Sequence, residues 1–143
     1  MKRRSYTLSK MIMGLFVMVT VSMAHAQSGD VLKVKVAFNF RVGTQTFPAG
    51  EYSLKPLLPH AMSVRNQAGQ VLTSIGTHSV ESGEAQRTSK LVFNGYDGQY
   101  FLTQIWEAGD DIGRELPKSP AEIEMATKDS PGQQIALRIV ARR

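Results

Sequence analysis

The chain contains no cysteine. This absence excludes disulfide bonds, thiolate metal sites and thiol catalysis. The sequence also lacks the Gly-x-Ser-x-Gly, His-Glu-x-x-His and phosphate-loop patterns of common hydrolases, zinc proteases and nucleotide-binding proteins. Its only two histidines beyond residue 26, His60 and His78, lie in separate segments, a spacing that favours surface or structural roles over a metal site. We therefore expect no cofactor and no bound metal.

No apolar run reaches the roughly 20 residues that a comfortable transmembrane helix needs. The longest run, Met11–Met23, follows a basic segment and precedes Ala24-His25-Ala26, whose small residues suit signal peptidase. We interpret residues 1–26 as a signal peptide cleaved after Ala26 and residues 27–143 as a single exported domain. The expected location is the periplasm or the outside of the cell, with no stable membrane anchor after cleavage.

Charge gives little indication of a partner once this segment is removed. The whole chain carries 17 Lys and Arg residues and a net charge of +5, but four of these cations lie in the first ten residues. The mature chain keeps 13 basic against 12 acidic residues, a net of +1. A nearly neutral domain gives no support for nucleic-acid binding, and we expect none.

The strongest structural signal is a hairpin. Two runs rich in aromatic and β-branched residues, Lys90–Tyr96 and Gln99–Trp106, flank Asp97-Gly98, a pair typical of a type I′ turn. A two-residue loop predicts that Gly95 faces Tyr100. Continued along the strands, this register predicts three further pairs: Tyr96 with Gln99, Phe93 with Leu102, and Leu91 with Gln104. It assigns one face to Leu91, Phe93, Tyr100, Leu102 and Trp106. It assigns the other face to Val92, Tyr96, Phe101 and Ile105.

Both faces of this hairpin are apolar, so both must be covered. The covering element is predicted to be a helix that begins after Ser119, where Ser-Pro-Ala-Glu combines an N-cap hydroxyl with Pro at the first helical position and Glu at the third. The helix should end near Lys128 and bury Ile123, Met125 and Ala126.

Alternating or turn-bounded segments predict the remaining strands. Asp30–Arg41 reads as one strand, followed by a Gly43-Thr44 turn that sets Phe40 opposite Phe47. Glu51–Leu57 reads as a strand that Pro56 places at an edge or stops pairing early.

A further hairpin is predicted for Ala61–Arg65 and Gln70–Thr77, with Val64 opposite Val71 and Met62 opposite Thr73. His78–Val80 extends it, Ser82–Ser89 reads as a polar loop, and Gln133–Arg143 reads as a last strand. The fold class is therefore mainly β: an antiparallel β-sandwich or small β-barrel of about eight or nine strands, with one short C-terminal helix before the last strand.

Two blocks of the sequence carry distinctive patterns. The first is VAFNFRVGTQTFPAGEYSL, residues 36–54, with a VGxxxxPAGxY pattern. The second is LVFNGYDGQYFLTQIW, followed by GRELPKSPAEIEMA, which carries a GRELPKSxAE pattern. Together the two blocks resemble those of a group of small uncharacterised exported bacterial proteins. The resemblance implies export and a shared β-rich fold, and it brings no catalytic or ligand residue with it.

Two sets of residues are candidates for function. The first is a possible binding site or structural latch made of Arg114, Glu115, Leu116, Pro117, Lys118 and Ser119. In the latch interpretation Ile112 and Leu116 plug the sheet and Gly113 provides a turn, with ion pairs flanking the anchor. The second set, possible ligand-lining aromatics, is Tyr96, Tyr100, Phe101 and Trp106, although core packing is the commoner fate of such a cluster.

Two classes of function remain open. The preferred one is an exported non-enzymatic β-domain that binds a partner protein, an envelope component or a small apolar ligand. The alternative is a hydrolase that uses carboxylates between Glu107 and Glu124, where six acids gather. Gly109-Asp110-Asp111 could also begin a calcium loop, but its spacing matches no known calcium-binding pattern, and a solvated acidic loop is the better interpretation.

Overall fold

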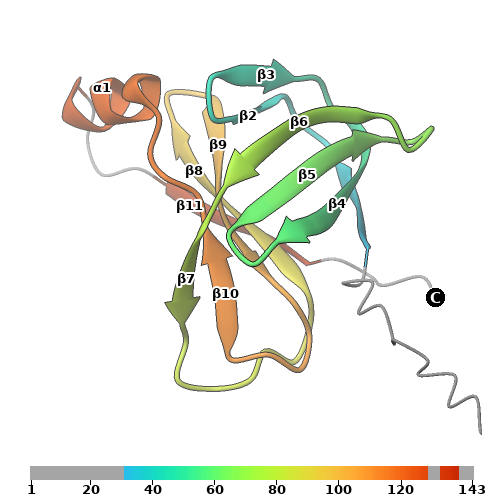
Figure 1. Cartoon of the computed structure of the whole chain (residues 1–143). Coiled ribbons are helices and arrows are strands. Elements are labelled where there is room, and N and C mark those ends of the chain that lie inside the picture. The colour runs from blue at the N-terminus through green and yellow to red at the C-terminus, as the bar shows by residue number, and fades with distance from the viewer. Residues whose placement is uncertain (1–30, 129–132, 139–143) are drawn as a thin grey trace, which may run out of the picture.

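The computed structural model describes residues 31–128 and 133–138. In this part of the chain, eleven strands form two sheets that face each other as a sandwich, and one helix precedes the last strand (Figure 1). The mainly β fold class is confirmed, and the sandwich is the form that the chain adopts. The signal peptide and its cleavage site lie outside the described residues.

The smaller sheet has four strands in the order β1-β4-β5-β6, all antiparallel. The bounds of its strands are β1 Leu32–Val36, β4 Gly50–Leu58, β5 Ala61–Asn66 and β6 Val71–Gly76.

The larger sheet has seven strands, of which five follow the order β11-β8-β9-β10-β7. The short β2–β3 hairpin joins it through a parallel pairing of β2 with β9. The bounds are β2 Phe40–Val42, β3 Gln45–Phe47, β7 His78–Glu81, β8 Lys90–Tyr96, β9 Gln99–Trp106, β10 Ile112–Glu115 and β11 Gln133–Arg138.

Three features explain why the strand count exceeds the predicted eight or nine. The predicted strand Asp30–Arg41 breaks after Val36, and its second half becomes β2 in the other sheet. The chain changes sheet again after β6, so β7 does not extend the β5–β6 hairpin but pairs with β10 (Figure 1). The third feature is β10 itself, which the sequence had suggested only as part of a latch.

The hydrophobic core lies between the two sheets. The ring of Phe40 lies 5.6 Å from that of Phe47 and meets the ring of Tyr52 edge-on at 5.2 Å. The Tyr52 hydroxyl donates a hydrogen bond to the Pro48 carbonyl at 2.6 Å, and burial raises the pKa of Tyr52. The buried residues of this cluster are Leu32, Val34, Val36, Phe40, Val42, Phe47, Tyr52, Leu54, Met62, Val64, Leu91, Phe93, Leu102, Ile105 and Leu116.

The β8–β9 hairpin has the predicted turn, since Asp97 and Gly98 both have positive φ, 46° and 74°. The predicted register holds for the pairs nearest the turn, including Gly95 with Tyr100. It fails beyond Phe93, because a β-bulge inserts Thr103 as an extra residue. The Thr103 hydroxyl donates to the Val92 carbonyl at 3.0 Å, which stabilises the bulge.

Because of this bulge, the residues of β9 after Thr103 lie on the opposite faces from those predicted. Leu91 pairs with Ile105 in place of Gln104, so Ile105 turns into the core. Trp106, predicted on the same face as Leu91 and Phe93, is buried on the opposite side of the sheet against Gly113. Because side chains alternate along a strand, one inserted residue exchanges the faces of all that follow.

The other turns give mixed outcomes. Gly43 has a φ of 60°, and Phe40 pairs with Phe47 as predicted. Pro56 lies in an interior strand, beyond the point where pairing with β1 ends, so it shortens the pairing without marking an edge. The predicted β5–β6 register is wrong by two residues, since Val64 faces Thr73 and Met62 faces Ile75.

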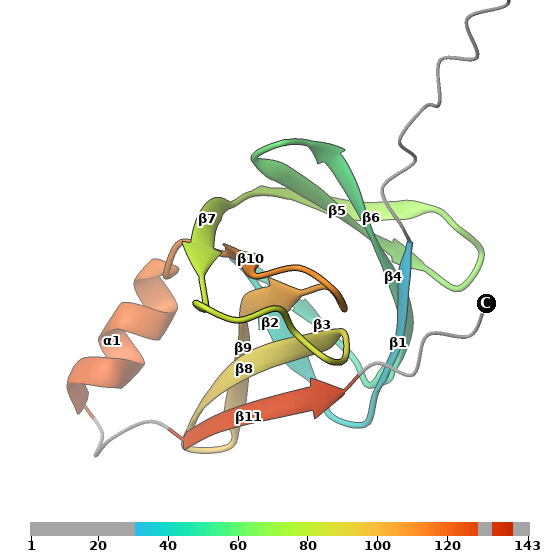
Figure 2. The same cartoon turned by 90° about the horizontal axis from the view of Figure 1, so that it is seen from below.

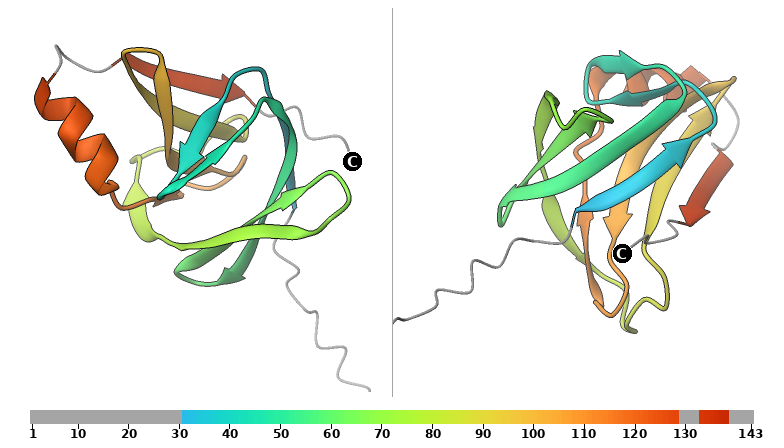
Figure 3. Two further views of the ribbon diagram at one scale, coloured as in Figure 1. Left: turned by 90° about the horizontal axis from the view of Figure 1, so that it is seen from above. Right: turned by 90° about the vertical axis from the view of Figure 1, so that its right-hand side faces the viewer.

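Helix α1, Pro120–Lys128, lies against the outer face of the larger sheet, on the side away from β4, β5 and β6 (Figures 2 and 3). Ser119 caps it as predicted: its hydroxyl accepts a hydrogen bond from the Glu122 N–H at 3.2 Å. The predicted buried stripe is wrong, because Ile123 is 51% exposed and Ala126 is exposed too. Glu122 is the buried residue of this helix, and it accepts a hydrogen bond from the Asn94 amide at 3.0 Å.

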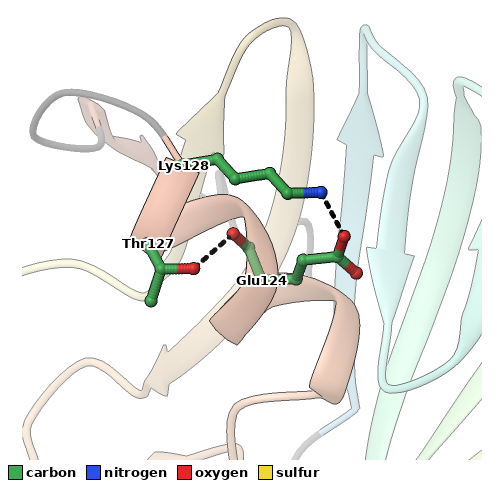
Figure 4. Close-up of polar contacts among 3 residues, drawn as sticks. All are labelled: Glu124, Thr127 and Lys128. Carbon is green, nitrogen blue, oxygen red and sulfur yellow. Dashed lines mark hydrogen bonds and ion pairs between the residues drawn. The ribbon is translucent and has the colours of Figure 1, made fainter.

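The last turn of α1 carries a local ion pair. Lys128 contacts Glu124 one turn earlier, and the Thr127 hydroxyl donates to the Glu124 carbonyl at 2.8 Å (Figure 4). The hydrogen bond from Lys128 and then its positive charge lower the pKa of Glu124. Both charged side chains are well exposed, so this pair contributes little to stability.

Candidate functional site

A groove of about 560 Å³ opens at one end of the sandwich. One wall is the β4–β5 turn of the smaller sheet, and the other consists of β10, the start of β7 and the segment after β9. Ile105, 2% exposed, and Gly113 are the buried residues among those that line it. The lining residues are Pro56, Leu57, Leu58, Pro59, Ser79, Ile105, Glu107, Asp110, Asp111, Ile112, Gly113 and Arg114.

The groove is lined in part by large apolar side chains that are exposed. Leu57, Leu58 and Ile112 are 45%, 66% and 53% exposed, and all three line it together with two prolines. Removing apolar area from water stabilises by about 25 cal/mol per Å². A partner that covers these three side chains would therefore gain binding free energy from each of them. Contiguous exposed apolar side chains of this kind mark interaction sites.

Arg114 fixes one wall to the other. Its Nη1 donates a hydrogen bond to the Pro59 carbonyl at 2.6 Å and approaches the Leu58 carbonyl at 3.5 Å. Arg114 is half-buried and pairs across strands with Ile105 and with Ser79. The guanidinium therefore joins the β4–β5 turn to β10, which differs from the flanking ion pairs predicted for it.

The acidic side of the groove belongs to the segment between β9 and β10. Asp110 and Asp111 are exposed, and their carbonyls accept hydrogen bonds at 2.9 Å from the N–H groups of Gln86 and Ser82 respectively. The predicted Ser82–Ser89 loop is thus present and is attached to this segment. Of the six acids predicted as a carboxylate region, Glu107, Asp110 and Asp111 line the groove, whereas Glu122 and Glu124 lie on α1.

The predicted string divides between structural and surface positions. Leu116 is 4% exposed in the core, and its N–H donates to the Thr103 carbonyl at 2.8 Å. Ser119 is buried as the helix cap, whereas Glu115, Pro117 and Lys118 are exposed. Of these six residues only Arg114 lines the groove.

Two further expectations of the latch are wrong. Ile112 does not plug the sheet, because it is largely exposed on the groove wall. Gly113 provides no turn: it lies within β10 without a positive φ, and its lack of a side chain makes room for the Trp106 ring.

The four aromatic candidates do not line the groove. Tyr96 and Phe101 are buried 6.0 Å apart on the outer face of the hairpin, where the Arg41 guanidinium lies 5.7 Å from the Phe101 ring. Trp106 packs against Gly113, and Tyr100 lies 4.4 Å from the Phe38 ring. The four aromatic side chains therefore pack against other residues of the domain and do not line the groove.

Sequence reasoning missed the apolar wall. The sequence predicts Leu57 only as the end of a strand, and the one available signal of a groove here is a pair of adjacent leucines directly before a proline. Nothing local indicated that Ile112 lies across from them.

The described residues hold no group of three or more His, Asp or Glu side chains arranged to bind a metal ion. Among these same residues, no helix has the length and apolarity that crossing a membrane requires. No protein-family model matches the chain, and neither a curated protein nor a solved structure matches it.

Proposed function

We propose that this chain is an exported, non-enzymatic domain that binds an extended apolar segment of a partner protein in the groove at the end of the sandwich. The observation that carries the proposal is the position of Leu57, Leu58 and Ile112, large apolar side chains exposed on the facing walls of a single groove. The signal peptide expected at residues 1–26 supports export.

A chain segment fits the groove better than a small molecule does. Small-molecule sites enclose most of their ligand, whereas this groove is open enough to leave its apolar walls about half exposed. Strand β7 contributes Ser79 to the groove and ends the larger sheet, so within the described chain its outer backbone edge faces no further strand. An extended segment that pairs with such an edge places alternate side chains in an adjacent groove.

Charge indicates which segments would bind. Asp110 and Asp111 are exposed on the rim, so a basic residue beside the apolar anchor is favoured. The rival function is a hydrolase that uses carboxylates between Glu107 and Glu124, of which Glu107, Asp110 and Asp111 line the groove. Asp110 and Asp111 are consecutive and exposed on one rim, whereas a hydrolase of this kind places its two carboxyl groups on opposite sides of the bond that it cleaves. The binding function is therefore preferred.

Site-specific cross-linking in the producing cells tests the proposal. A photoreactive benzoylphenylalanine in place of Leu58 is expected to give a discrete protein adduct, whereas the same residue in place of Ile123, which is 51% exposed on α1, gives none. Adding Ile112→Asp should abolish the adduct without unfolding the domain, because the Ile112 side chain is largely exposed.

Three outcomes contradict the proposal. Equal adducts at Leu58 and Ile123 indicate non-specific contact. A Leu58 adduct that survives Ile112→Asp shows that the groove is not the contact. Hydrolysis of model glycosides or esters that is lost in Asp110→Asn together with Asp111→Asn favours the enzyme.

A further inference from the structure

The outer face of the smaller sheet concentrates positive charge. Side chains alternate along a strand, and the inward set of β1, β4 and β5 fills the core. The outward set includes Lys33 and Lys35 on β1, Lys55 on β4 and Arg65 on β5, with Glu51 as its one acid. Cross-strand pairing places Lys33 beside Ser53 and Ser53 beside Arg65, so the cations form one surface and not separate edges.

The remainder of the described chain has the opposite balance. Outside the four strands of this sheet it carries seven Lys and Arg residues against nine Asp and Glu residues. The acids include the groove residues Asp110 and Asp111, which belong to the other sheet's connections. The net charge of the domain is close to zero, but its positive charge gathers on one face of the smaller sheet.

Two further observations describe this face. The Arg65 Nε donates to the Ser63 hydroxyl at 3.3 Å, and that hydroxyl donates to the Lys55 carbonyl at 3.2 Å, which holds the guanidinium along the sheet. Exposed apolar side chains border the cations: Val31, 45% exposed, directly precedes β1, and Val71, 54% exposed, pairs across strands with Arg65.

We propose that this face docks the domain on an anionic lipid surface. The cations match phospholipid phosphates in charge, and they are spread over three strands of one sheet face, which suits the many headgroups of a bilayer better than a single compact ligand. The bordering valines provide shallow apolar contact with the headgroup region, the combination that surface-bound proteins use. Docking here leaves the groove for a separate partner, because the groove takes only the end of β4 and Pro59 from this sheet. This proposal therefore does not depend on the proposed function.

Cosedimentation of residues 27–143 with vesicles tests it. Vesicles of phosphatidylcholine with 30% phosphatidylglycerol are expected to bind the protein at 50 mM salt, whereas pure phosphatidylcholine vesicles do not. Each cation near such a surface contributes about 1 kcal/mol, which is about fivefold in partitioning, so Lys33→Thr with Lys35→Thr should weaken binding about 25-fold. Binding should also fall steeply at 300 mM salt, because salt screens exposed charges.

The matched control removes the same charge elsewhere. Arg87→Thr with Lys128→Thr replaces two exposed cations outside this sheet and should leave vesicle binding within about twofold. Val71→Ser should weaken vesicle binding but leave binding to soluble polyphosphate unchanged. Equal losses in the two double variants overturn the proposal, as does no difference between the two vesicle compositions. Binding to polyphosphate without vesicle binding would identify a soluble polyanion as the ligand instead and also overturns it.

Discussion

Substitution of Gly113 by Ala tests how β10 packs on the larger sheet. A Cβ at this position would lie 2.6 Å from the Cδ2 and Cε3 atoms of Trp106 and 2.8 Å from Cζ3. The ring is 5% exposed, its Nε1 donates to the Gln104 amide oxygen at 3.1 Å, and the Lys90 ammonium lies 5.8 Å from its centre. It therefore has little room to move aside.

The expected magnitude is a difference between two effects. Alanine is favoured over glycine in a strand by roughly 0.5–1 kcal/mol, and Gly113 has no positive φ that would reverse this preference. Overpacking of a rigid core contact costs about 1–3 kcal/mol. We expect Gly113→Ala to lower the free energy of unfolding by roughly 1–2 kcal/mol in urea denaturation.

Gly76 provides the matched control. It lies in β6 without a positive φ, and the nearest atom to a Cβ there is the His60 carbonyl oxygen at 3.9 Å. Gly76→Ala should therefore be neutral or slightly stabilising. In a Trp106→Leu background, the penalty of Gly113→Ala should largely disappear, because the ring that it meets is gone. If Gly113→Ala and Gly76→Ala change the unfolding free energy equally, the contact with Trp106 does not determine the residue at this position.

The remaining predictions concern the core, the helix cap and export. Leu116→Ala should lower the unfolding free energy in urea by roughly 2–5 kcal/mol, because the side chain is 4% exposed; a wild-type midpoint would refute its place in the core. Ser119→Ala should cost about 1 kcal/mol in the same assay, and Ser119→Asp should retain most of the stability, since aspartate is also a good cap; equal losses would contradict the capping role. Thr77→Val should raise the melting temperature, because the buried Thr77 hydroxyl has no hydrogen-bond partner among the described residues; a lower value would show that the hydroxyl is satisfied. Ala26→Leu should leave unprocessed precursor in the membrane fraction, and normal processing would place the cleavage site elsewhere.

The sequence predicted correctly those elements that depend on residues close together in the chain. The Asp97-Gly98 turn was predictable because these two residues accept positive φ. The start of α1 was predictable because the Ser119 hydroxyl caps the helix. The register of β8 and β9 followed from the turn only as far as Phe93. The Thr103 bulge could not be read from the strand, because part of its stabilisation comes from Leu116, whose N–H binds the Thr103 carbonyl from outside the hairpin.

Contacts between segments far apart in the sequence could not be predicted, because they depend on how the whole chain folds. Helix α1 has a weak apolar stripe, and Glu122 is its buried residue because the Asn94 amide on β8 donates a hydrogen bond to its carboxylate. That pair is separated by 28 positions in the sequence, and neither residue indicates the other. The groove is a further case, since Arg114 reaches the Pro59 carbonyl from 55 positions away.

The alternation of β10 explains why its sequence resembled a functional motif without being one site. Ile112, Arg114 and Leu116 point to the inner side, and their exposure falls along this series from 53% at Ile112 to 4% at Leu116. The inner side of a single strand thus runs from the groove wall into the core, while Gly113 contacts Trp106 on the outer side. Residues on one side of this segment therefore help both to close the core and to line the groove. Leu57 and Leu58, at the end of β4, line the groove and are not part of the core cluster, so substitutions at these two positions should change the groove at little cost to the fold.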